Sequence, residues 1–224
     1  MGRITAEFIA RLEIILRLYV LPYDEQYPVI CFDERPCFLI GDTVEGLDMQ
    51  AGQVAKENYA YSKHGSCCVL AAIEPLTGQR FAHIRVKRRK QEFALFMQEL
   101  VQHYPKAKRL RIVLDNLNTH GYHSFYEVFD AETAALLTQK VEFIFTPKNA
   151  SWLNMIEIEF SVLSRQCLNR RIPCIKKLEK QVLTFFKERS GKGIKINWQF
   201  TQEQARQKLN RRYSEVNASN TKYK

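Results

Sequence analysis

The stretch Leu110-Arg111-Ile112-Val113-Leu114-Asp115-Asn116 joins an aliphatic run directly to a carboxylate. A short run of this kind is typical of a strand buried on both faces at the centre of a sheet. A carboxylate at the end of such a strand is costly to desolvate unless something positive compensates it. Asp115 is therefore the first candidate for a functional side chain.

Two other acids have similar neighbourhoods. Asp33 ends the apolar run Val29-Ile30-Cys31-Phe32, and Glu157 closes Trp152-Leu153-Asn154-Met155-Ile156-Glu157 at the start of a predicted helix. A helix N-terminus favours an acid or a phosphate. Taken singly, each acid has a structural alternative, such as a pairing of Asp33 with Arg35 or a turn begun by Asp115. Together they suggest a shared site for a divalent cation.

Hydrophobic periodicity predicts alternating elements around these acids. Helices are expected at 6–21, 91–103, 123–139, 153–163, 175–186 and 201–209, and strands at 28–32, 67–73, 80–86, 110–114 and 141–145. A further short strand at 59–62 and a turn at 63–66 would form a hairpin with 67–73, after an exposed loop at 42–58. Three consecutive strands followed by alternating helices and strands predict an α/β fold, a mixed five-stranded sheet flanked by helices.

The domain boundaries follow from the same pattern. Residues 1–24 are expected to form a linker helix and residues 25–190 the α/β domain, while 191–224 are expected to form a basic C-terminal helix and a disordered, frayed tail. In open α/β sheets, sites gather beyond the carboxyl ends of the strands. The predicted positions of Asp33, Asp115 and Glu157 agree with that rule.

Composition excludes several classes of protein. Hydrophobic residues make up 46% of the 224 residues, which argues against a disordered chain. No apolar run is long enough to span a bilayer, and no signal-peptide cleavage site follows the first apolar stretch, so a soluble, cytoplasmic protein is expected. The six cysteines contain no C-x-x-C pair and are interpreted as reduced structural thiols.

Positive charge is concentrated in the C-terminal part of the chain. From Phe160 onward, sixteen Lys and Arg stand against four acids, a net charge of +12, which leaves −2 for the preceding residues out of the total of +10. This asymmetry suggests a polyanion partner, with a merely solvated basic surface as the alternative. A second basic block, residues 85–90, points the same way more weakly.

Carboxylates and cations in separate segments suit metal-dependent chemistry on nucleic acid. Mg²⁺ prefers hard oxygen ligands and binds through a few carboxylates together with substrate phosphates and water. Two such ions can stabilise the attacking and leaving oxygens of an in-line phosphoryl displacement.

Three sequence blocks resemble the motif blocks of bacterial insertion-sequence transposases of the DDE type, in the branch related to the mariner superfamily. The blocks are Cys31-Phe32-Asp33-Glu34-Arg35-Pro36, Leu114-Asp115-Asn116-Leu117-Asn118-Thr119-His120 and residues 146–157, TPKNASWLNMIE. The resemblance covers about residues 6–212. It implies a ribonuclease H-like catalytic domain with polynucleotidyl transferase activity and two Mg²⁺ ions, for which Mn²⁺ can substitute.

The resemblance also assigns roles to residues. Asp33, Asp115 and Glu157 match the metal-binding catalytic triad, and the motif selects Glu157 over Glu159, which helical geometry alone does not. Four residues are expected to support these ligands or contact DNA: Asn116, Asn118, His120 and Asn154. Seven cations are expected to bind the DNA backbone: Lys87, Arg88, Arg89, Lys148, Arg165, Arg170 and Arg171.

The expected partner is double-stranded DNA, both element ends and target, bound by a homodimer associated with the nucleoid of a prokaryotic cell. Transposases of this type carry helix-turn-helix domains before the catalytic domain, whereas this sequence begins close to it. A separately encoded helix-turn-helix subunit or a frameshift-fused domain is therefore expected. Two alternatives remain open at this point: a non-catalytic DNA-binding remnant, and a cellular ribonuclease H-like nuclease.

Overall fold

The fold is built on one mixed five-stranded sheet with the order β3-β2-β1-β4-β5. The computed structural model describes residues 4–43 and 59–223. Strands β1 and β2 and strands β2 and β3 pair antiparallel, whereas β4 runs parallel to β1 and to β5. The strands are β1 (Val29–Asp42), β2 (Tyr61–Glu74), β3 (Gln79–Arg85), β4 (Leu110–Leu114) and β5 (Val141–Phe145). The predicted mixed sheet is confirmed.

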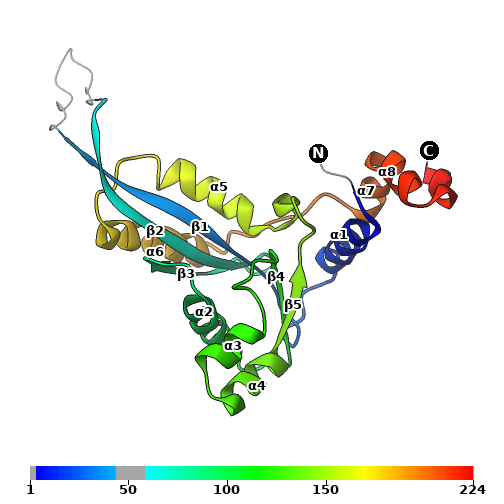
Figure 1. Ribbon diagram of the computed structural model, residues 1–224, viewed down its shortest axis with the longest axis horizontal. Coiled ribbons are helices and arrows are strands. Elements are labelled where there is room, and N and C mark those ends of the chain that lie inside the picture. The colour runs from blue at the N-terminus through cyan, green and yellow to red at the C-terminus, as the bar shows by residue number, and fades with distance from the viewer. Residues whose placement is uncertain (1–3, 44–58, 224) are drawn as a thin grey trace.

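Helices cover both faces of this sheet (Figure 1). They are α1 (Ala6–Tyr19), α2 (Lys90–His103), α3 (His123–Val128), α4 (Ala131–Lys140), α5 (Ile156–Gln166), α6 (Ile175–Gly191), α7 (Gln202–Lys208) and α8 (Asn210–Val216), with short 3₁₀ helices η1 (Ser151–Leu153) and η2 (Ala218–Tyr223). Helices α1, α5 and α6 share one hydrophobic cluster with one face of the sheet. Helices α2, α3 and α4 share a second cluster with the other face.

Strand β1 is longer than its apolar run predicts. It pairs with β4 only over Val29, Ile30 and Cys31, and then continues to Asp42 paired with β2 alone. Among the described residues no strand pairs with the other edge of this part of β1, and a proline such as Pro36 is tolerated on such an edge. As a consequence Asp33 lies within β1, not at its end. The long β1–β2 pair extends beyond the rest of the sheet (Figure 1).

The turn predicted at residues 63–66 is wrong. These residues belong to β2, and the register opposite β1 shifts between Leu39 and Ile40, where Gly65 has φ +118°. A shift of this kind is a β-bulge, which often uses a glycine. Most of residues 61–66 are exposed, so the sequence here has neither the alternation nor the apolar run of a half-buried or buried strand. Most of the loop predicted at 42–58 lies outside the described residues.

The single helix predicted at 123–139 is divided into α3 and α4. Phe129 has an extended conformation, and Asp130 caps α4 by accepting a hydrogen bond from the backbone N–H of Thr133. Aspartate is among the preferred N-cap residues, which explains the new helix start. In place of the frayed tail predicted at the C-terminus, α8 continues to Val216 and η2 follows it.

The helix predicted as a linker is part of the packed structure. Leu12, Ile15 and Leu16 of α1 are fully buried in the same cluster as the sheet, and Arg206 of α7 forms an ion pair with Glu13 at 2.7 Å. Among the described residues, no helix combines the length and apolarity that a membrane span requires.

Candidate active site

Asp33 and Asp115 extend from two neighbouring parallel strands. Cys31 of β1 lies opposite Val113 of β4. Asp33 lies two residues after Cys31 within β1, and Asp115 lies two residues after Val113, just past the end of β4. Neighbouring strands are about 4.8 Å apart, and residues two apart point to the same face. Cys31 and Val113 both face the cluster that contains α5. Asp33 is therefore directed to the α5 side of the sheet, and Asp115 follows the end of the neighbouring strand.

Glu157 reaches this region from the first turn of α5. The start of α5 is attached to β1 by Asn154, whose buried side-chain Nδ2 donates a hydrogen bond to the carbonyl of Phe32 at 2.8 Å. Phe32 immediately precedes Asp33, so this hydrogen bond sets the beginning of α5 beside the first acid. Asn154 thus contacts the backbone that holds the acid.

The charges of Asp115 and Glu157 act on the carboxylate of Asp33. Burial raises the pKa of Asp33 to about 7, a backbone hydrogen bond from Glu34 opposes the shift, and the charges of Asp115 and Glu157 raise it further. Within the described residues, no three His, Cys, Asp or Glu side chains are grouped closely enough to hold a metal ion as they stand. The acids therefore converge on one region without forming a closed set of ligands.

His120 joins Asp115 to a buried acid that the sequence interpretation did not include. His120 Nδ1 lies 2.6 Å from Asp115 Oδ1, and Nε2 lies 3.4 Å from Glu34 Oε1. Burial lowers the pKa of His120, but the hydrogen bonds and charges of Asp115 and Glu34 outweigh it and raise the pKa to about 9. A protonated imidazole donates from both nitrogens. His120 therefore orients Asp115. The sequence offered one signal for Glu34, namely that it directly follows the candidate acid Asp33.

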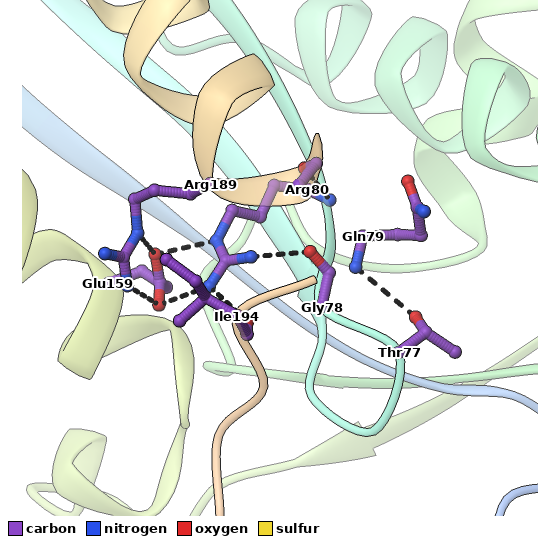
Figure 2. A network of polar contacts seen from close by, with 8 residues as sticks. Thr77, Gly78, Gln79, Arg80, Glu159, Arg189 and Ile194 are labelled. Atoms are coloured by element: carbon purple, nitrogen blue, oxygen red, sulfur yellow. Dashed lines mark hydrogen bonds and ion pairs between the residues drawn. The ribbon is translucent and has the colours of Figure 1, made fainter. Parts of the chain in front are cut away.

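Both carboxylate oxygens of Glu159 already accept hydrogen bonds from arginines, so Glu159 is not available to the site. Arg80 of β3 and Arg189 of α6 both hold it in bidentate hydrogen bonds of 2.8 to 3.0 Å, and Arg80 also donates to the carbonyls of Gly78 and Ile194 (Figure 2). Burial alone would raise the pKa of Glu159, but the two guanidinium groups lower it overall. The geometry therefore separates Glu157 from Glu159, which the helical wheel could not do.

The other predicted polar residues near the site have varied surroundings. Asn116 and Asn118 are exposed on the loop after β4, and the Asn118 carbonyl lies 2.8 Å from His123 Nε2. Arg88 is half-exposed with its Nε 3.9 Å from Glu34 Oε2, which brings it next to the His120 network. Lys148 is exposed on the loop that leads from β5 toward α5.

The predicted DNA-binding cations do not form one patch. Lys87, Arg88 and Arg89 precede α2, while Arg165 and Arg170 are exposed toward and beyond the C-terminal end of α5. Arg171 forms an ion pair at 2.6 Å with Asp42 at the far end of β1. Asp42 lies nine positions after Asp33 along β1, a distance of about 30 Å. The structure thus places Arg88 near the acids and Arg171 far from them.

A family model for the DDE superfamily endonucleases matches residues 28–179, more than half of the chain. The chain belongs to the DDE superfamily of endonucleases. The predicted family is confirmed, and the match includes all three candidate acids of this DDE endonuclease.

Solved structures show the same fold. The DDE endonuclease is similar to the Mos1 mariner paired end complex with Mn, with a TM-score of 0.56 and 16% identity, and the match covers 100% of this chain and 67% of that one. The match to the Mos1 strand transfer complex has a TM-score of 0.57 and 14% identity, and it covers 100% of this chain and 66% of that one. The chain therefore spans about two thirds of these proteins, and the ribonuclease H-like fold is confirmed. A comparison with curated proteins gave no match.

Proposed function

We propose that this chain is the catalytic domain of a DNA transposase that cleaves the strands of an insertion sequence and transfers them to target DNA. The observation that supports the proposal is that Asp115 and Glu157 lie near enough to Asp33 for their charges to raise its pKa. The family match and the fold shared with the Mos1 complexes support it.

Asp33, Asp115 and Glu157 would hold the divalent ions, Mg²⁺ or Mn²⁺. Their carboxylate oxygens are the hard ligands that these ions prefer, and mutual repulsion of acids in a partly buried site favours a bound cation. When bound, two such ions supply an activated nucleophile and stabilise the leaving oxygen. The solved Mos1 structures include complexes with Mn and with Mg.

The protein's own side chains prepare the site for that chemistry. His120 holds Asp115 in one orientation through the 2.6 Å contact, with Glu34 on its other nitrogen. Asn154 holds the start of α5 against β1. Asn116 and Asn118 are exposed on the loop that begins at Asp115, and the cations Lys87, Arg88, Arg89 and Lys148 are exposed and available to DNA. Double-stranded DNA, bound by a homodimer at the prokaryotic nucleoid, is the proposed substrate, with helix-turn-helix recognition supplied by another subunit or a fused segment.

Metal-dependent cleavage of duplex DNA by the purified chain tests this function. Asp115→Asn and Glu157→Gln should each abolish cleavage with Mg²⁺ or Mn²⁺ while duplex binding is retained, because each replaces a metal-binding carboxylate with a neutral amide and removes no cation that could hold the DNA backbone. Glu132→Gln, an exposed acid on α4, is the matched control and should cleave normally.

Cleavage that survives in Asp115→Asn would contradict the assignment. DNA binding without metal-dependent cleavage in the unmodified chain would favour a non-catalytic remnant. Hydrolysis of RNA–DNA hybrids without joining of the freed 3′ ends would favour a cellular ribonuclease H-like nuclease.

A further inference from the structure

A basic groove lies between the C-terminal end of α5 and one face of α6. Its volume is about 550 Å³, and its lining includes Arg170, Lys177, Lys180, Phe185 and Glu188. The α6 residues recur at three- to five-residue spacings, so they share one exposed face of the helix. The opposite face of α6, with Leu178, Val182 and Phe186, is buried in the core.

The positive charge of this groove is not neutralised by the protein. Three cations line it against the single acid Glu188. Within the described part of the chain, Lys177 and Lys180 form no ion pair, and Arg170 donates only to the carbonyl of Cys167. Unpaired ammonium and guanidinium groups along a groove are suited to a row of phosphates.

The distance from the acids fits one duplex that contacts both places. Gln166, which lines the groove, lies nine residues after Glu157 on α5, a separation of about 14 Å along the helix axis. Half a turn of B-DNA spans about 17 Å, and the major groove is about 12 Å wide. A duplex with one phosphate at the acids can therefore place other phosphates at α6.

We propose that the α5–α6 groove binds the backbone of double-stranded DNA about half a helical turn from the cleaved phosphate. The inference rests on the proposed function for the position of that phosphate. A single strand is the less suitable occupant, because strand binding relies on exposed aromatic rings for stacking. Phe185 is half-buried, and Arg189 already covers its ring at 5.4 Å from the centroid.

A charge-matched pair of double variants tests the groove. Lys177→Gln/Lys180→Gln removes two groove cations, and Lys187→Gln/Lys192→Gln removes two exposed lysines outside the lining. Binding of a 30-base-pair duplex is measured by fluorescence anisotropy over a salt series. Each phosphate contact contributes about 0.9 to the slope of log affinity against log salt. The slope of the groove variant should be less steep than that of the wild type by up to about 1.8, because two phosphate contacts are lost, and the control variant should retain the wild-type slope.

Equal effects of the two double variants would overturn the proposal, and so would a loss confined to single-stranded DNA of the same length. Thermal melting checks that both variants fold. Acetylation of wild-type lysines with and without duplex gives an independent readout, with protection expected at Lys177 and Lys180 but not at Lys187 and Lys192. If the groove proposal is wrong, the two double variants have equal salt slopes while the unmodified chain still cleaves DNA. If the proposed function is wrong, the unmodified chain does not cleave DNA, and the difference in salt slope between the two double variants is unaffected.

Discussion

Glu157 and Glu159 lie two positions apart on α5 and have opposite surroundings. Glu159 is 1% exposed and bound by Arg80 and Arg189, while Glu157 is half-buried beside Asp33. Because Arg80 and Arg189 belong to β3 and α6, the Glu159 network connects three elements. It also fixes the rotation of α5 about its own axis, and that rotation directs Glu157 to the other acids.

We predict that Glu159→Gln destabilises the protein by about 3 kcal/mol or more, because removing one partner of a buried ion pair leaves the other charge uncompensated. Denaturant unfolding measures the change. Glu157→Gln is the matched control and should leave the free energy of unfolding nearly unchanged, since within the described residues this side chain has no ion pair. Equal stability of the two variants would show that the network contributes little.

The same network predicts a dependence of stability on pH. The folded-state pKa of Glu159 is lowered from 4.5, so its stabilisation is present above 4.5 and is lost as the pH falls through the folded-state pKa. Glutamine imitates the protonated acid. The stability difference between wild type and Glu159→Gln should therefore be constant near pH 7 and shrink below pH 4.5 in urea unfolding series. A difference that stays constant down to pH 3 would contradict this assignment.

At the scale of elements, the β2–β3 turn depends on contact with the segment that follows α6. Gly78 has φ +83°, and a Cβ there would lie 2.7 Å from the carbonyl oxygen of Ile194. Gly65 in the β2 bulge has φ +118° but nothing within 4 Å of a Cβ. Both positions need glycine for the backbone, and only Gly78 needs it for packing.

Gly78→Ala should therefore destabilise the protein more than Gly65→Ala. The backbone strain common to both costs about 1–2 kcal/mol, and the clash with Ile194 adds to it at Gly78 alone. Thermal melting of the two variants gives the comparison. A larger loss in Gly65→Ala would mean that the bulge, and not the turn, limits stability.

At the scale of the whole molecule, the charge count from Phe160 onward overstates the surface available to DNA. Arg171, Arg189 and Arg206 are engaged by acids of β1, α5 and α1, and two further arginines pair with Glu215. The pairs of Arg189 and Arg206 attach α6 and α7 to the rest of the fold, whereas the Glu215 pairs lie within α8. The cations that remain exposed include those of the α5–α6 groove.

We predict that duplex binding by this chain depends steeply on salt and only weakly on base sequence, because phosphate contacts supply the affinity. Anisotropy titrations with two duplexes of unrelated sequence should give parallel lines of log affinity against log salt. A difference of more than about tenfold between the two sequences at one salt concentration would indicate base readout.

The amino-acid sequence by itself was enough to predict the mixed sheet, most of its helices and the neighbourhoods of the three acids. These features depend on local patterns, namely short apolar runs, helical periodicity and an acid at the end of a buried strand. The sequence also placed His120 and Asn154 near the acids, although it did not reveal their partners, because Glu34 and the carbonyl of Phe32 are far away along the chain.

Only the tertiary structure decided which glutamate of α5 faces the acids, how β1 continues past Asp33 and which cations are already paired. The helical wheel treats Glu157 and Glu159 alike, and two arginines distant in sequence make them different. Residues 61–66 of β2 lack a hydrophobic pattern because most of them are exposed, although Leu39 of β1 opposite them is buried. Such long-range contacts leave no periodic trace in the sequence, so they become visible only when the chain is folded.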